Sequence, residues 1–169
     1  MKQTPRITGT YRAEVTRHDG SIERYYIEND VVDTGLNLML DRVDSGLGST
    51  MYIGLIVYPA GTLTNADTLA SHSGWTESTD YAGSRQAWSP AAASSQKVTN
   101  AASPAEFTMD AVVTTIYGCF LATVASGTSG TLFSTGQFQQ QNGALVANGI
   151  AFSSGDVLKI IYELEALRY

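Results

Sequence analysis

The longest run of β-branched, aromatic and apolar residues in the chain is Phe107-Thr-Met-Asp-Ala-Val-Val-Thr-Thr-Ile-Tyr-Gly-Cys-Phe-Leu-Ala-Thr-Val124. This composition is typical of a β-strand, so we predict one central strand over residues 107–124. Alternate positions fall on two faces, and both faces are mostly apolar. Because such a strand needs cover on each side, we expect a second layer of sheet packed against it. Two other apolar runs, residues 51–58 and 157–164, are expected to close off this body.

Length and composition indicate a single β domain. The 169 residues are enough for one domain with a proper core and too few to expect two. Charged residues make up only 15%, against about 25% in an average globular domain, and small polar residues replace them. We therefore expect a mostly β fold: an antiparallel two-sheet sandwich, jelly-roll-like, with one short helix near the N-terminus.

Charge and hydropathy argue against several classes of partner. The formal net charge of −6 argues against nucleic acid, whose phosphates call for a basic stripe. Residues 1–6 are followed by no apolar segment, and no window approaches 18 apolar residues, so we expect neither a signal peptide nor a membrane span. Cys119 is the only cysteine, which rules out an intrachain disulfide. We expect synthesis in the cytoplasm.

The first third of the chain predicts a hairpin and a helix. Residues 8–17 alternate in polarity and residues 22–27 follow, and Asp19-Gly20 between them is a typical tight turn. Residues 31–43 have helical spacing behind Asp33 or Thr34 as N-cap. The residues expected on the apolar face of this helix are Leu36, Met39, Leu40 and Val43.

The remaining pattern is strands separated by one long irregular segment. We predict strands over residues 51–58, 131–138 and 157–164, the last with Leu158, Ile160, Tyr162 and Leu164 on one face. Residues 68–104 lack a regular pattern, except for one short strand near residues 96–100. Long aromatic segments of this kind are functional loops or partner-contacting arms. We favour an arm over residues 68–104, and we expect the N-terminal segment, residues 1–7, to be a second partner-contacting extension.

The search for chemistry predicts no catalytic residue, no metal site and no cofactor. His18 and His72 have no second ligand at metal spacing; we expect His18 to be a solvated turn residue and His72 to bond to neighbouring backbone. Cys119 is expected to be a core residue. Asp30, Asp33, Asp41 and Asp44 bracket the predicted helix and are expected to cap it or lie on its exposed face. A carboxylate pair that meets only in space stays open as an alternative.

Trp75, Tyr81, Arg85 and Trp88 are the candidate interface residues. Large amphipathic rings and a guanidinium in one irregular segment are the residue types that anchor protein interfaces. An alternative is equally open at this point: both tryptophans could cover an edge of the domain's own core.

Several motifs of the chain resemble those of tailed-bacteriophage structural proteins. The opening hairpin and helix resemble the openings of many such proteins, and later segments are similar to small virion proteins encoded near the major capsid gene. The motifs that carry the resemblance are Glu28-Asn-Asp-Val-Val-Asp-Thr-Gly-Leu-Asn-Leu38, Met51-Tyr-Ile-Gly-Leu-Ile56, Asp67-Thr-Leu-Ala-Ser-His-Ser-Gly-Trp-Thr-Glu77, Arg85-Gln-Ala-Trp-Ser-Pro90, Ile116-Tyr-Gly-Cys-Phe-Leu121, Gly130-Thr-Leu-Phe-Ser134 and Gly155-Asp-Val-Leu-Lys-Ile160.

The resemblance implies a capsid decoration protein, or cement protein. Such a protein binds the major capsid protein on the outer surface of the virion, commonly as a homotrimer at the junctions between capsomers, and has no enzymatic activity. Two alternatives remain. The opening segment also resembles tail and tail-fibre components, and Trp75, Tyr81 and Trp88 could form the stacking platform of a carbohydrate-binding module.

Overall fold

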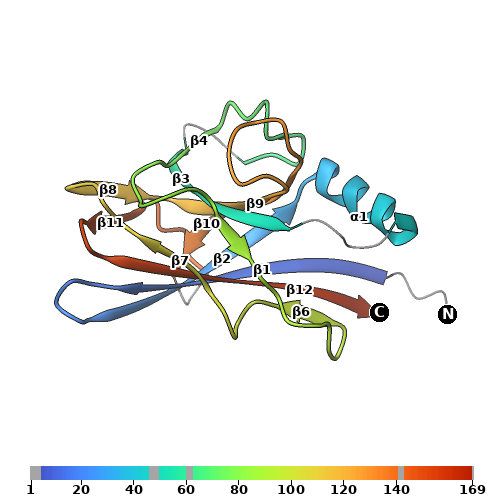
Figure 1. The fold of residues 1–169 in the computed structure, drawn as a ribbon, viewed down its shortest axis with the longest axis horizontal. Coiled ribbons are helices and arrows are strands. Elements are labelled where there is room, and N and C mark those ends of the chain that lie inside the picture. Colours follow the sequence, from blue (N-terminus) through green and yellow to red (C-terminus); the bar gives the residue numbers. More distant parts are fainter. Residues whose placement is uncertain (1–4, 46–49, 60–62, 141–142, 169) are drawn as a thin grey trace.

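The computed structural model describes residues 5–45, 50–59, 63–140 and 143–168. Within these ranges the chain forms one helix and twelve strands (Figure 1). The elements in chain order are β1 (Pro5–Thr16), β2 (Ile22–Val31), α1 (Asp33–Ser45), β3 (Met51–Pro59), β4 (Trp75–Glu77), β5 (Gln86–Trp88), β6 (Lys97–Thr99), β7 (Ala105–Thr108), β8 (Val113–Ile116), β9 (Gly118–Ala122), β10 (Leu132–Gln139), β11 (Ile150–Ser153) and β12 (Val157–Arg168).

One antiparallel sheet makes up most of the molecule. Its strands are ordered β4-β3-β9-β10-β2-β1-β12-β6, with β5 beside β3 and β7 beside β12, and β8 and β11 form a separate two-stranded ribbon. β1 pairs with β12 along its whole length, from Pro5 opposite Arg168 to Thr16 opposite Val157. The prediction of a mostly β, antiparallel fold with one short helix near the N-terminus is confirmed.

The sheet curls, so that its two halves face each other across one core. The indole of Trp88 in β5 donates to the carbonyl of Tyr162 in β12 at 3.3 Å, although these strands belong to opposite halves of the sheet. The main core cluster contains Ile53 and Leu55 of β3 together with Val15 of β1 and residues of β12. The expected second layer is therefore supplied by the curvature of the same sheet.

The prediction of one strand over residues 107–124 is wrong. The run is divided among β7, β8 and β9, which belong to different parts of the fold. The chain bends after β7, where the side chains of Val112 and Val113 are 85% and 70% exposed. Between β8 and β9 the amide of Tyr117 donates to the carbonyl of Ile56. Apolar composition alone did not reveal these two breaks. Valine is typical of strands, but the exposed bend after β7 contains two valines.

β9 is an interior strand of the main sheet, and both of its faces are buried. Cys119 and Leu121 face the main core, whereas Phe120 and Ala122 face a second cluster that includes Trp75. The two-faced burial expected for the long run is thus confirmed for β9. Its neighbours are β3 and β10.

The hairpin prediction is confirmed. β1 and β2 pair up to Thr16 opposite Ile22, and the amide of Arg17 donates to the carbonyl of Ser21 at 2.9 Å. Gly20 has φ +84°, in the left-handed region that a three-residue hairpin loop requires at its last position. The last strand is also confirmed, because Leu158, Ile160 and Tyr162 of β12 are fully buried.

Helix α1 is confirmed, but its cap and part of its face are wrong. The amide of Leu36 donates to the carbonyl of Val32, so Val32 holds the N-cap position, and the hydroxyl of Thr34 donates instead to the carbonyl of Leu132. Leu36 is exposed, whereas Leu38 and Met39 pack against the main core. The side chains of Leu40 and Val43 lie outside the described residues.

Close approach of strands at Gly118 predicts that Gly118→Ala destabilises the fold. A Cβ at this position would overlap the carbonyl oxygen of Gly136 and lie 2.9 Å from Cα of Gln137. Backbone atoms cannot move aside as a flexible side chain can, so we expect a loss of about 3 kcal/mol in the free energy of unfolding, measured by urea denaturation. Gly143→Ala is the control: its Cβ meets no atom within 4 Å, and its φ of +82° implies a cost of about 1 kcal/mol. Equal losses for the two variants would contradict this packing argument.

Candidate functional site

Three of the four candidate interface residues lie inside the protein's own core. Trp75 is 3% exposed, and Tyr81 and Arg85 are each 4% exposed. Trp88 is half-buried and packs against the main core. Residues 68–104 are less irregular than predicted, because this segment adds β4, β5 and β6 to the main sheet; contact of this segment with a partner stays a prediction. The N-terminal extension is corrected in part, since Pro5–Ile7 belong to β1 and residues 1–4 lie outside the described residues.

Arg85 ties three parts of the chain together. Its guanidinium donates to both carboxylate oxygens of Glu77, at 2.6 and 2.7 Å. It also donates to the carbonyls of Val124 and Gly127, each at 2.9 Å, and lies 5.1 Å from the ring centre of Phe120. Only an arginine presents enough donors in a planar fork to make these bonds at once. Arg85 therefore holds the connection between β9 and β10 against β4.

The indole of Trp75 packs against two other rings. His72 stacks on it with ring centres 3.7 Å apart, and Phe120 lies 5.0 Å away. The indole nitrogen donates to the carboxylate of Asp67 at 3.1 Å. His72 Nδ1 lies 3.1 Å from the carbonyl of Trp75, which confirms the expected bond to neighbouring backbone. Since a sugar ring stacks on an open aromatic face, the platform predicted from Trp75 and Tyr81 is wrong for these two residues.

A second cluster, which the sequence did not reveal, joins the β1–β2 hairpin to the turn before β12. The carboxylate of Asp156 accepts bonds from the amides of His18 and Ser153, at 2.9 and 3.0 Å, and from Arg17 at 3.2 Å. Arg17 also pairs with Glu23 at 2.9 Å. Burial raises the pKa of Asp156, but the bonds from Ser153, Arg17 and His18 outweigh it, so the pKa is lowered from its ordinary value. No local pattern signals a contact between residues 17 and 156.

The other titratable residues singled out from the sequence have structural positions. Cys119 is fully buried, as expected, and burial raises the pKa of its thiol. His18 and Asp33 are exposed, as expected, whereas the side chains of Asp30, Asp41 and Asp44 lie outside the described residues. Within the described ranges, no three His, Cys, Asp or Glu side chains come together as metal ligands.

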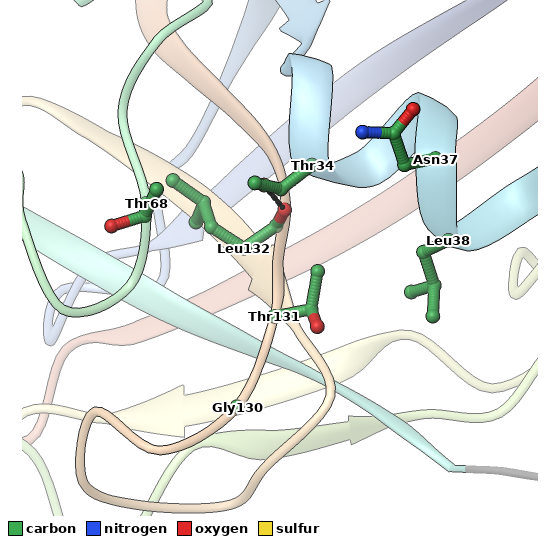
Figure 2. A pocket seen from close by; sticks show the side chains of 7 residues that line it. All are labelled: Thr34, Asn37, Leu38, Thr68, Gly130, Thr131 and Leu132. Carbon is green, nitrogen blue, oxygen red and sulfur yellow. Dashed lines mark hydrogen bonds between the residues drawn. The ribbon is translucent and has the colours of Figure 1, made fainter.

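A small pocket lies beside helix α1. Its volume is about 280 Å³, near the lower end for ligand sites. Figure 2 shows that its side chains come from α1, from the 64–71 loop and from the connection between β9 and β10. The lining residues are Thr34, Asn37, Leu38, Thr68, Gly130, Thr131 and Leu132. The lining carries no charged side chain, and the hydroxyl of Thr34 is already bonded to the carbonyl of Leu132.

A larger groove lies on the outer face of β2, β1 and β12. Its volume is about 420 Å³, and its lining residues are Arg12, Ala13, Glu14, Arg24, Tyr25, Tyr26, Pro104, Lys159 and Ile161. The strand register explains the arrangement, because Tyr11, Ala13, Ile27 and Ile160 point into the core and alternate residues point outward. We call this surface the outer groove.

Two rows of side chains cross the outer groove. Arg12 stands opposite Tyr26 on one side and Ile161 on the other, and Glu14 stands opposite Arg24 and Lys159 in the same way. The rows are about 7 Å apart, the spacing of alternate residues on a strand. The first row is largely apolar, and the second alternates in charge.

No protein-family model matches the chain, and no curated protein matches it in sequence. Among the described residues, no helix is long and apolar enough to cross a bilayer. The role of the chain therefore has to be argued from its own geometry.

We predict that Arg85→Met costs about 3 kcal/mol in the free energy of unfolding, because it leaves Glu77 and two carbonyls without their donor. The free energy of unfolding of Arg85→Lys is expected to lie between those of Arg85→Met and wild type, since one ammonium group cannot reach all the acceptors. Arg24→Met is the matched control: its bond to Glu14 is exposed and contributes less than about 1 kcal/mol. Urea denaturation measures all three variants, and equal losses for Arg85→Met and Arg24→Met would contradict the structural role of Arg85.

The lowered pKa of Asp156 predicts a pH-dependent contribution to stability. A carboxyl group whose pKa is lower in the folded state stabilises the fold above its unfolded pKa, about 3.9, and loses this contribution as the pH falls through the folded value. We expect Asp156→Asn to cost about 2 kcal/mol at pH 7 and to make the loss of stability below about pH 4 shallower than in wild type. Urea denaturation at a series of pH values tests this. Asp110→Asn, at an exposed position, should retain the wild-type profile; an unchanged profile in Asp156→Asn would refute the assignment.

Proposed function

We propose that the protein is a structural component of a tailed-bacteriophage virion, which decorates the outer surface of the capsid by binding the major capsid protein. The outer face of β2, β1 and β12 carries the proposal. Its side chains include Arg12, Tyr26 and Ile22, and the last two are 46% and 51% exposed. Arginine and tyrosine are enriched among the residues that dominate binding at protein interfaces.

The charged clusters elsewhere support a scaffold role. The carboxylate of Glu77 accepts two hydrogen bonds from Arg85. The carboxylate of Asp156 accepts hydrogen bonds from Arg17 and from two backbone amides. In both clusters the charged atoms hold loops against the sheet. A body whose loops are held in this way loses little conformational entropy on docking, which suits a subunit that holds neighbouring subunits together.

The finer architecture is part of the proposal. We propose that the curled antiparallel sheet is a jelly-roll-like sandwich, with α1 at the end where β1 begins. Association as a homotrimer follows from the resemblance to cement proteins, and it would place three outer faces around one axis. Several modest contacts made together give a large gain in avidity, so each copy needs only a weak site.

The test is binding of the recombinant protein to isolated capsids that lack it. We expect many copies per particle, counted by quantitative mass spectrometry after sedimentation, and shells that release their genome at a higher temperature. Particles without tails are the control and should bind equally well. A few copies at one vertex would identify a tail component and overturn the proposal, and so would the absence of binding.

A further inference from the structure

We propose that the outer groove binds a segment of a partner protein in which a carboxylate stands next to an apolar side chain, with the carboxylate on Arg12. This inference rests on the proposed function, because it names the chemistry that the groove recognises in its partner. The observations behind it are the hydrogen bonds of the three groove cations and the side chains that surround Arg12.

Arg12 differs from the other two cations of the outer groove. Arg24 donates to Glu14 at 3.0 Å, and Lys159 pairs with Glu106 at 3.0 Å. Within the described residues, the ionic contact of Arg12 is to Glu163 at 3.6 Å, which is too long for a hydrogen bond. The side chain of Arg12 is 47% exposed. Its guanidinium therefore keeps the planar fork of donors that binds a carboxylate through two parallel bonds.

Apolar side chains flank Arg12 on both neighbouring strands. Tyr26 and Ile161 stand opposite it on the neighbouring strands, and Pro104 completes this row of the groove lining. An occupant that covers Tyr26 and Ile161 removes water from around Arg12, and a charge-assisted hydrogen bond gains strength as the local dielectric falls. The same row thus selects for an apolar group beside the acid.

The charge pattern favours a polypeptide over a nucleic acid. A phosphate backbone is bound by several cations in series, whereas Arg24 and Lys159 are already neutralised by Glu14 and Glu106. A guanidinium that makes an ionic contact but no close carboxylate bond among the described residues, and that stands beside an aromatic ring, matches a single carboxylate.

The experiment uses a fluorescein-labelled ten-residue peptide of alternating glutamate and leucine, and measures its fluorescence anisotropy with the full chain. We expect saturable binding, and roughly tenfold weaker binding of the peptide in which glutamine replaces glutamate, because the amide forfeits the ion pair. A single-stranded DNA oligomer of equal charge should not compete. This comparison needs no protein variant, so equal affinity for the two peptides, or displacement by DNA, overturns the proposal.

Variants locate the site. Arg12→Gln should lower the affinity for the glutamate peptide roughly fivefold and leave the affinity for the glutamine peptide unchanged. Tyr26→Ala should lower the affinity for both peptides. Val112→Ala is the control, since Val112 is 85% exposed and outside the groove lining, and it should have no effect. Loss of binding in Val112→Ala equal to that in Tyr26→Ala would overturn the assignment to the groove.

Binding to capsids separates this inference from the proposed function. If capsids bind wild type and Arg12→Gln equally, the groove assignment is overturned and the decoration role stands. If the glutamate peptide binds in the groove but capsids do not bind wild type, the decoration role is overturned and the groove assignment stands.

Discussion

The need to cover both faces of β9 governs the architecture. Cys119 and Leu121 on one face are covered because the long sheet curls and brings β1 and β12 over them. Phe120 on the other face is covered by Trp75, the first residue of β4, and by the loop before it, which carries Leu69. Loops do not form a regular ladder of backbone hydrogen bonds, so this layer needs other stabilising contacts. Arg85, with its bonds to Glu77 and to the 124–127 loop, and Asp67, with its bond to Trp75, supply them.

The sequence predicted what local signals encode. Asp19-Gly20 specifies a hairpin because glycine accepts the left-handed backbone, and the alternation in β12 specifies which face is buried. The short strand predicted near residues 96–100 is confirmed as β6, whereas the breaks around Tyr117 and the strands β4 and β5 were not predicted. Strands of three residues are too short to show a period, and they exist because β3 and β12 offer edges for pairing. The cap of α1 was misassigned because Thr34 bonds to Leu132, which is 98 residues away in sequence.

The candidate site shows the same limit. Tryptophan and arginine were correctly identified as residues that bury surface, but composition does not tell an internal contact from an external one, because the same physics stabilises both. Trp75 and Arg85 serve the inside of the molecule. The outward-facing groups, Arg12 and Tyr26, look unremarkable in sequence and become neighbours only through the register of β1 with β2. The second cluster was not predicted for a similar reason, because Arg17 and Asp156 are 139 residues apart in sequence and meet only in the folded structure.

The pairing of β1 with β12, which places Pro5 opposite Arg168, determines where domains fused to this protein would lie. β1 begins at the end of the body where the antiparallel β12 finishes, so a domain fused before Pro5 and another fused after Arg168 would emerge side by side. Arg12 lies seven residues further along β1, about 23 Å away in an extended strand. Fused domains of moderate size at these two positions would thus leave the outer groove accessible. A short peptide linker between the same two positions would give a circular polypeptide with the same strand order.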